Sequence, residues 1–175
     1  FVDKSFPKAV SVVNSFHVVQ WIIHSIDLYI RELEKGFRKR DRELQDIKSA
    51  EAGYPVTLPL SHELYMLKKY RWLILSNQSN IRYHTDTRMD PHFKRLMNTY
   101  DYEDELYLVS PRLFTLRDLK ERYISFNDRN AGHPMQAATE LEDLIDHYFH
   151  CGDSIFVDFA QLLCKYKEPI INSFV

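Results

Sequence analysis

Apolar residues recur at helical spacing along most of this chain. Steps of three and four residues from about His17 to about Arg40 predict a long helix, with an apolar seam at Val19, Ile22, Ile26, Tyr29, Leu33 and Phe37. Further helical stretches follow at about 63–76, 92–99, 102–109, 115–127, 135–149 and 155–167. Residues 9–13 have a different pattern, a short apolar and β-branched run that predicts a buried strand. We therefore expect a mainly α fold of six to seven helices with one N-terminal strand.

The seam of the first helix has two interpretations. It can pack into the core of the chain, or it can form a surface where two copies of the chain associate. Trp21 and Leu28 lie on a second side of the same helix, so this helix is expected to be covered on more than one face. We favour the core over the dimer surface.

Composition narrows the classes of protein that need to be considered. Hydrophobic residues are 45% and charged residues 27% of the 175 positions, which is ordinary for a globular domain with a packed core. The formal net charge is −2, so any contact with nucleic acid has to come from local basic patches. No apolar run approaches the length of a membrane span, and the two cysteines fit a reducing compartment. We expect a cytoplasmic protein with no membrane partner.

Two local basic clusters are candidates for contact with DNA phosphates. The first lies near the predicted end of the long helix, where Lys35, Arg38, Lys39, Arg40 and Arg42 gather, and its candidates for DNA contact are Arg38, Lys39 and Arg40. Basic residues there also suit the helix dipole without any ligand. The second is interleaved with aromatic residues and consists of Lys68, Lys69 and Arg71. Such a pattern can bind phosphates and stack on bases, but it is equally that of an ordinary amphipathic helix with its charges outward.

The N-terminal stretch carries a resemblance to a known family. Residues 12–19 read Val-Val-Asn-Ser-Phe-His-Val-Val, after Phe-Pro-Lys-Ala at 6–9. This stretch resembles the second-acid segment of bacterial insertion-sequence transposases of the ISL-three type, where an apolar strand is followed by Asp-x-Phe-His-Val. Residues 67–75 resemble the family's Leu-Lys-x-x-Arg-Trp-Leu-Leu segment, and residues 96–102, 116–126 and 159–174 match in order. The resemblance covers nearly the whole chain.

The resemblance implies a fold and an activity for the parent protein. These DDE transposases have an RNase-H-like core in which three acids hold two Mg²⁺ ions for cutting and joining DNA. It implies that residues 1–41 are part of that core, that 42–152 are a helical insertion, and that 153–175 lead back to the core. The first acid would lie upstream and the third beyond Val175. DNA at the transposon ends would be the partner.

The position of the second acid holds Asn14, which is neutral. The segment is therefore expected to be inactive by itself and to hold no metal, whatever its parent does. Its expected contribution is structure and DNA positioning. Whether this chain is to be classed as an enzyme stays open.

Two alternatives remain. The chain could be a helical protein-interaction or dimerisation module, a catalytically inactive relic that forms a homodimer through the seam. The segment Arg129-Asn130-x-x-His133 also resembles the Arg-x-x-x-x-His motif of HEPN-type ribonucleases, although its spacing is one residue short.

Overall fold

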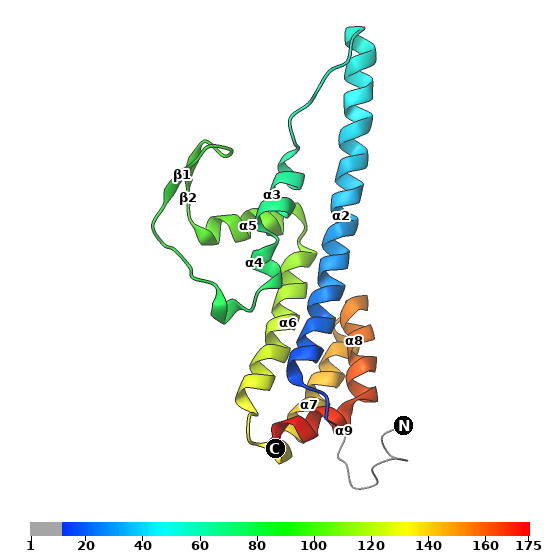
Figure 1. The fold of residues 1–175 in the computed structure, drawn as a ribbon, viewed down its shortest axis with the longest axis vertical. Helices are drawn as coiled ribbons and strands as arrows, with labels where there is room; N and C mark the ends of the chain where they lie inside the picture. Colours follow the sequence, from blue (N-terminus) through cyan, green and yellow to red (C-terminus); the bar gives the residue numbers. More distant parts are fainter. Residues whose placement is uncertain (1–11) are drawn as a thin grey trace. The chain divides into compact units, whose positions relative to one another are not determined.

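The computed structural model describes residues 12–175 (Figure 1). These residues divide into two compact units, of which the first combines residues 12–26 with Asp118–Val175 and the second is Asp27–Arg117. Two helices, α2 and α6, contribute residues to both units. Each unit is described by itself below.

Helix α2 spans Ser15–Ala52 and is longer than its apolar seam predicts. Its most buried residues are Val18, Ile22, Ile26 and Ile30, at steps of four. Beyond Phe37 the sequence is almost entirely polar, but it is rich in Arg, Lys, Glu and Gln, which are strong helix formers. The helix continues until Gly53, whose positive φ of 76° suits the residue that ends a helix.

The first unit has an aromatic core. Besides the start of α2 and the later part of α6 (Arg112–Arg129), it contains α7 (Pro134–His150), α8 (Ser154–Lys165), α9 (Lys167–Ile171) and the 3-10 turn η2 (Asn172–Phe174). Helices α7 and α8 pack on each other. Asp153 caps α8, because its side chain accepts a hydrogen bond from the Ile155 N–H at 2.9 Å. The buried rings belong to Tyr123, Phe126, Tyr148, Phe156, Phe159 and Phe174.

The second unit contains a small hairpin among short helices. Its elements after α2 are α3 (His62–Tyr70), α4 (Trp72–Leu75), the 3-10 turn η1 (Gln78–Asn80), β1 (Arg88–Asp90), β2 (Arg95–Met97) and α5 (Thr99–Val109). Helix α3 packs on α5 through a core that includes Leu64, Leu67 and Leu106. A capping box between Asn98 and Asp101 starts α5.

The mainly helical prediction is confirmed, and its details need three corrections. Residues 12–175 form eight α-helices rather than six or seven. The predicted helix at 92–99 is instead an antiparallel hairpin in which Met89 pairs with Leu96. Its turn is set by Asp90, whose side chain accepts hydrogen bonds from the N–H groups of His92 and Phe93 at 2.8 and 3.2 Å.

The third correction concerns the N-terminal strand predicted at 9–13. Its first part, 9–11, lies outside the described residues, and Val12 and Val13 are irregular rather than strand. The N–H of Val13 donates to the Pro169 carbonyl at 3.0 Å. Within residues 12–175, no helix is both long enough and apolar enough to cross a bilayer.

Candidate nucleic-acid interface

Basic side chains line one side of α2 within the second unit. Arg31, Lys35, Arg38 and Arg42 follow one another at steps of four, three and four residues, which places them on one helical face. This face extends over about 16 Å of helix axis, since each helical residue rises about 1.5 Å. A DNA duplex carries about one negative charge per 1.7 Å of its axis, so this length of duplex would carry about ten phosphates for the four cations of the face.

A groove lies beside this face, and we call it the α2–α3 groove. Its volume is about 470 Å³. Five basic side chains and one acidic side chain line it: Arg31, Glu34, Lys35 and Arg38 from α2, Lys68 from α3, and Arg71 from the junction of α3 and α4. The groove is therefore strongly cationic, although the whole chain is slightly acidic.

A second hollow of about 340 Å³ continues the basic face along α2. It shares Lys35 and Arg38 with the α2–α3 groove and adds Lys39 and Arg42, but Glu43 and Asp46 also line it. Its positive charge is thus weaker than that of the groove. The α2–α3 groove is the better candidate for an anion.

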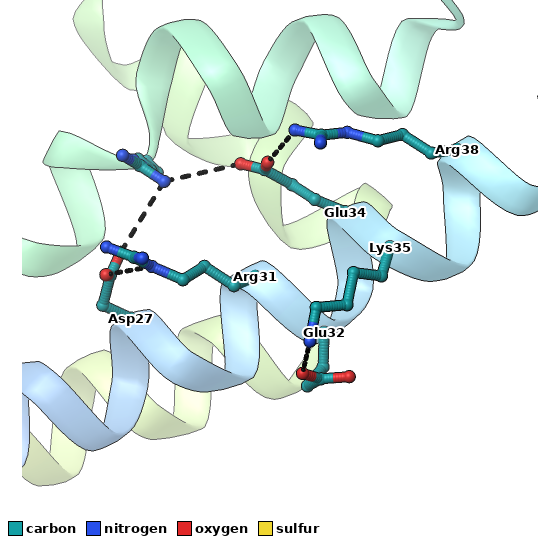
Figure 2. Close-up of polar contacts among 7 residues, drawn as sticks. Asp27, Arg31, Glu32, Glu34, Lys35 and Arg38 are labelled. Carbon is teal, nitrogen blue, oxygen red and sulfur yellow. Dashed lines mark hydrogen bonds and ion pairs between the residues drawn. The ribbon is translucent and has the colours of Figure 1, made fainter.

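Carboxylates of α2 hold several of these cations in place (Figure 2). The Arg31 Nε donates to Asp27 at 2.7 Å, and the Arg38 guanidinium donates to Glu34 at 2.9 Å. Lys35 pairs with the exposed Glu32. The arginine heads remain half exposed, whereas the Glu34 side chain is only 9% exposed. Cations therefore face solvent above a buried acid.

Lys68 and Lys69 point to different surroundings although they are neighbours on α3. Lys68 lines the α2–α3 groove and has no ion pair among residues 12–175. Lys69 instead donates to the Tyr65 hydroxyl at 2.7 Å, and this hydrogen bond raises the pKa of Lys69. Its ammonium group also lies over the rings of Tyr65 and Tyr70. Of the two lysines, only Lys68 is free to meet a ligand in the groove.

Arg40, which the sequence also suggested for DNA contact, is bound to a carboxylate of α3. Its guanidinium donates two hydrogen bonds to Glu63, at 2.7 and 3.0 Å, and two longer ones to Asp41. The hydrogen bonds from Arg40 lower the pKa of Glu63 to about 2. Arg40 thus links α2 to α3 and does not line the groove.

The Arg40–Glu63 pair gives a testable pH dependence of stability. The folded-state pKa of Glu63 lies below its ordinary value of 4.5, so the pair stabilises the fold above about pH 4.5 and this contribution disappears as the pH falls toward 2. Because both side chains are partly exposed, we expect Arg40→Gln to lower the free energy of unfolding at pH 7 by only about 0.5 kcal/mol. Urea unfolding of the variant and the parent at pH 7 and pH 3 measures this difference. A difference that does not shrink at pH 3 would contradict the assignment.

The structure therefore divides the six basic residues suggested by the sequence. Arg38, Lys68 and Arg71 come together in the α2–α3 groove, Lys39 lies in the adjoining hollow, and Arg40 and Lys69 are engaged elsewhere. Arg31 and Lys35 belong to the groove but were not among the six. Their spacing of four and three residues from Arg38 was the available signal.

Asn14 caps α2. Its side-chain oxygen accepts a hydrogen bond from the Phe16 N–H at 2.8 Å, and its backbone carbonyl accepts one from the His17 N–H at 2.9 Å. Asparagine is among the residues most favoured at this position. The role seen for Asn14 is thus local and structural.

Mg²⁺ requires several oxygen ligands and carboxylates to offset its charge. Asn14 supplies one neutral oxygen that is already hydrogen-bonded. Across the part of the chain that the structure describes, no three His, Cys, Asp or Glu side chains gather in a way that could hold a metal ion. The donors among residues 12–175 therefore do not fit a Mg²⁺ site.

The structure also describes Arg129 and His133, the residues of the ribonuclease alternative. Arg129 pairs with Glu140 at 3.2 Å, and His133 directly precedes α7. In this arrangement Arg129 closes the turn between α6 and α7 through its pair with a residue of α7.

Residues 12–175 thus form a mainly helical structure with a cationic face on α2 beside a groove of about 470 Å³. A local basic surface of this kind is the charge pattern expected of a nucleic-acid-binding domain. Comparison with known families identifies the class of protein. The family model for transposases of the DDE ISL3 type matches residues 1–175. The chain belongs to this family of transposases, which act on DNA and use Mg²⁺. No curated protein and no solved structure matches it.

Proposed function

We propose that this chain is the central segment of a DDE transposase that moves an insertion sequence by metal-dependent DNA cleavage and strand transfer. Within that protein, residues 1–41 belong to the RNase-H-like core, 42–152 are a helical insertion, and 153–175 return to the core. The segment supplies structure and positions DNA, and the transposase works in the cytoplasm. Family membership supports the reaction, and the basic face of α2 supports the role in DNA positioning.

The observation that carries the DNA-positioning role is the charge of the α2–α3 groove. Five cationic side chains from α2, α3 and the segment after α3 converge there, in a chain whose net charge is −2. Bringing so many like charges together is unfavourable unless an anion offsets them. The carboxylates of Asp27, Glu32 and Glu34 offset part of this charge. DNA phosphates would offset the remainder and release their counterions.

The adjacent lysines of α3 provide the test. Lys68→Glu is expected to weaken binding of the chain to duplex DNA about 10-fold and to lower the salt-dependence slope by about 1. Lys69→Glu makes the same charge change one residue away, but on a side chain held by Tyr65 outside the groove, so it should have a much smaller effect. Fluorescence anisotropy with a labelled duplex at several salt concentrations measures both quantities.

This comparison separates a local site from general electrostatics. If the two variants weaken binding equally, the net charge and not the groove governs the affinity. If the unmodified chain does not bind duplex DNA at all, the proposal of DNA positioning is wrong. Circular dichroism of both variants shows whether α3 is intact.

The two alternatives from the sequence are not carried into the proposal. Of the predicted seam, Ile22 and Ile26 are fully buried within the chain, which favours the core interpretation for this part of α2. The ribonuclease motif has its Arg129 in a salt bridge, and the family match concerns transposases.

A further inference from the structure

One buried carboxylate, that of Glu34, lines the α2–α3 groove. The burial of α2 follows Val18, Ile22, Ile26 and Ile30 at steps of four, and the next position in this series is Glu34. Its side chain is 9% exposed, and that of Asp27 is 15% exposed. Acids are rarely buried in this way unless they are paired. A buried acid therefore occupies a position where the pattern of the helix would accept an apolar residue.

These two acids share three arginines. Asp27 Oδ2 accepts a hydrogen bond from Arg31, and Glu34 Oε2 accepts one from Arg38. The other oxygens, Asp27 Oδ1 and Glu34 Oε1, face the Arg71 guanidinium at 3.7 and 3.5 Å. The acids thus space the three guanidinium groups around the groove.

The arginines keep donors available for a ligand. A guanidinium has five N–H donors, and Arg31 and Arg38 each use one on their carboxylate. Arg71 lies at ion-pair distance from both acids without a hydrogen bond to either among the described residues, since Asp27 Oδ1 and Glu34 Oε1 have no hydrogen-bond partner there. Arginine forks of this kind match the oxygens of a phosphate group.

The lining also indicates what the groove does not recognise. All six lining side chains are charged, and none is an aromatic ring or a side-chain amide. Base recognition commonly uses side-chain amides or stacking rings, and the guanidinium groups of Arg31 and Arg38 are held here by carboxylates. A groove of about 470 Å³ lined by five cations and one carboxylate fits the sugar–phosphate backbone.

We infer that the α2–α3 groove binds a phosphodiester of duplex DNA without reading its sequence, and that Glu34, with Asp27, is a positioning residue that fixes the arginines for this contact. This inference rests on the proposed DNA-positioning function. It predicts that removing the negative charge of Glu34 weakens DNA binding. An acid beside a DNA site should repel DNA, but Glu34 is here expected to increase the affinity for DNA.

The test is Glu34→Gln compared with Glu51→Gln. Each variant removes one negative charge from α2, but Glu51 is exposed near the end of the helix and does not line the groove. Glu34→Gln is expected to weaken duplex binding about fivefold, because the hydrogen bond that fixes Arg38 is weakened. Glu51→Gln should leave the affinity unchanged or slightly higher. Anisotropy titrations with two duplexes of unrelated sequence should give the same result.

A second variant, Glu34→Asp, keeps the negative charge and shortens the side chain. If the acid acted only by charge repulsion, the affinity for DNA would not change. If it positions Arg38, the affinity for DNA should fall. Equal or tighter binding by a folded Glu34→Gln would overturn the inference. If Glu34→Gln does not fold, the inference is overturned when Glu34→Asp binds DNA with the same affinity as the unmodified chain. The proposed DNA-positioning function fails in a different way. In that case the unmodified chain does not bind DNA, or Lys68→Glu has no effect on binding.

Discussion

Arg117→Met is expected to lower the free energy of unfolding by about 3 to 5 kcal/mol, because it leaves a buried carboxylate without its cation. Arg117 and Glu103 lie 2.5 Å apart in the second unit, and their side chains are 6% and 10% exposed. Two tyrosines complete the cluster. Arg117 donates to the Tyr107 hydroxyl at 2.8 Å and to the Tyr83 hydroxyl, which in turn donates to Glu103.

The electrostatics of this cluster show how strongly its members depend on one another. Burial, and then the hydrogen bond with Glu103, raise the pKa of Tyr83 to about 12. Burial opposes the charge of Arg117, but its hydrogen bonds to Tyr107 and Tyr83 raise its pKa overall. Removal of the arginine would therefore leave both a carboxylate and two hydroxyl groups in a poorly solvated site.

A double-mutant cycle distinguishes a buried ion pair from simple loss of packing. The variant Arg117→Met with Glu103→Met removes both charges and should recover most of the lost stability. Urea unfolding of the parent, the two single variants and the double variant gives the coupling energy. Additive losses, or a loss below about 1 kcal/mol for Arg117→Met, would contradict this account.

Local signals allowed most helices to be predicted from the sequence. Gly152 and Asp153 mark the start of α8 through a cap that depends only on neighbouring residues. The apolar stripes of α6, α7 and α8 follow from helical periodicity. The end of α2 was predicted twelve residues too early, at Arg40 rather than Ala52, because the polar segment carries no apolar seam. Helix propensity and pairs such as Lys39–Glu43 extend α2 instead.

The hairpin could not be predicted in the same way. Strands β1 and β2 have three residues each, too few for an alternating pattern to be recognised. They are held by contacts distant in sequence, including the hydrogen bond from the Tyr102 hydroxyl to Asp90 at 2.8 Å. Asp90-Pro91 was the one local signal for a turn. The hairpin conformation of β1 and β2 is thus determined by tertiary contacts rather than by local sequence.

The candidate site was predicted only as far as its residue types. A run of basic residues shows that charge is present, but the direction of each side chain depends on the phase of its helix. Lys68 and Lys69 differ by one position and therefore by about 100° around the axis of α3. Only the packing of α3 determines that Lys68 faces the groove and Lys69 faces Tyr65.

Asn14→Asp is expected to fold like the parent. An aspartate at this position can accept the same hydrogen bond from the Phe16 N–H that Asn14 accepts now. Its negative charge would also lie at the N-terminus of α2, where the helix dipole favours it. We expect the free energy of unfolding to change by less than about 0.5 kcal/mol, whereas Asn14→Ala removes the cap and should lose about 1 kcal/mol.

The effect on activity should be much larger than the effect on stability. In a longer protein that carries the first and third acids, a carboxylate at position 14 would complete the acidic triad of the family. We expect Asn14→Asp to raise cleavage of DNA that bears the element's ends by at least about 100-fold in the presence of Mg²⁺. Asn14→Ala, which adds no carboxylate, should stay at the level of the parent. If the parent already cleaves DNA, or if Asn14→Asp folds and remains inactive, then Asn14 does not occupy the position of the second acid. Its role would then be limited to the capping of α2.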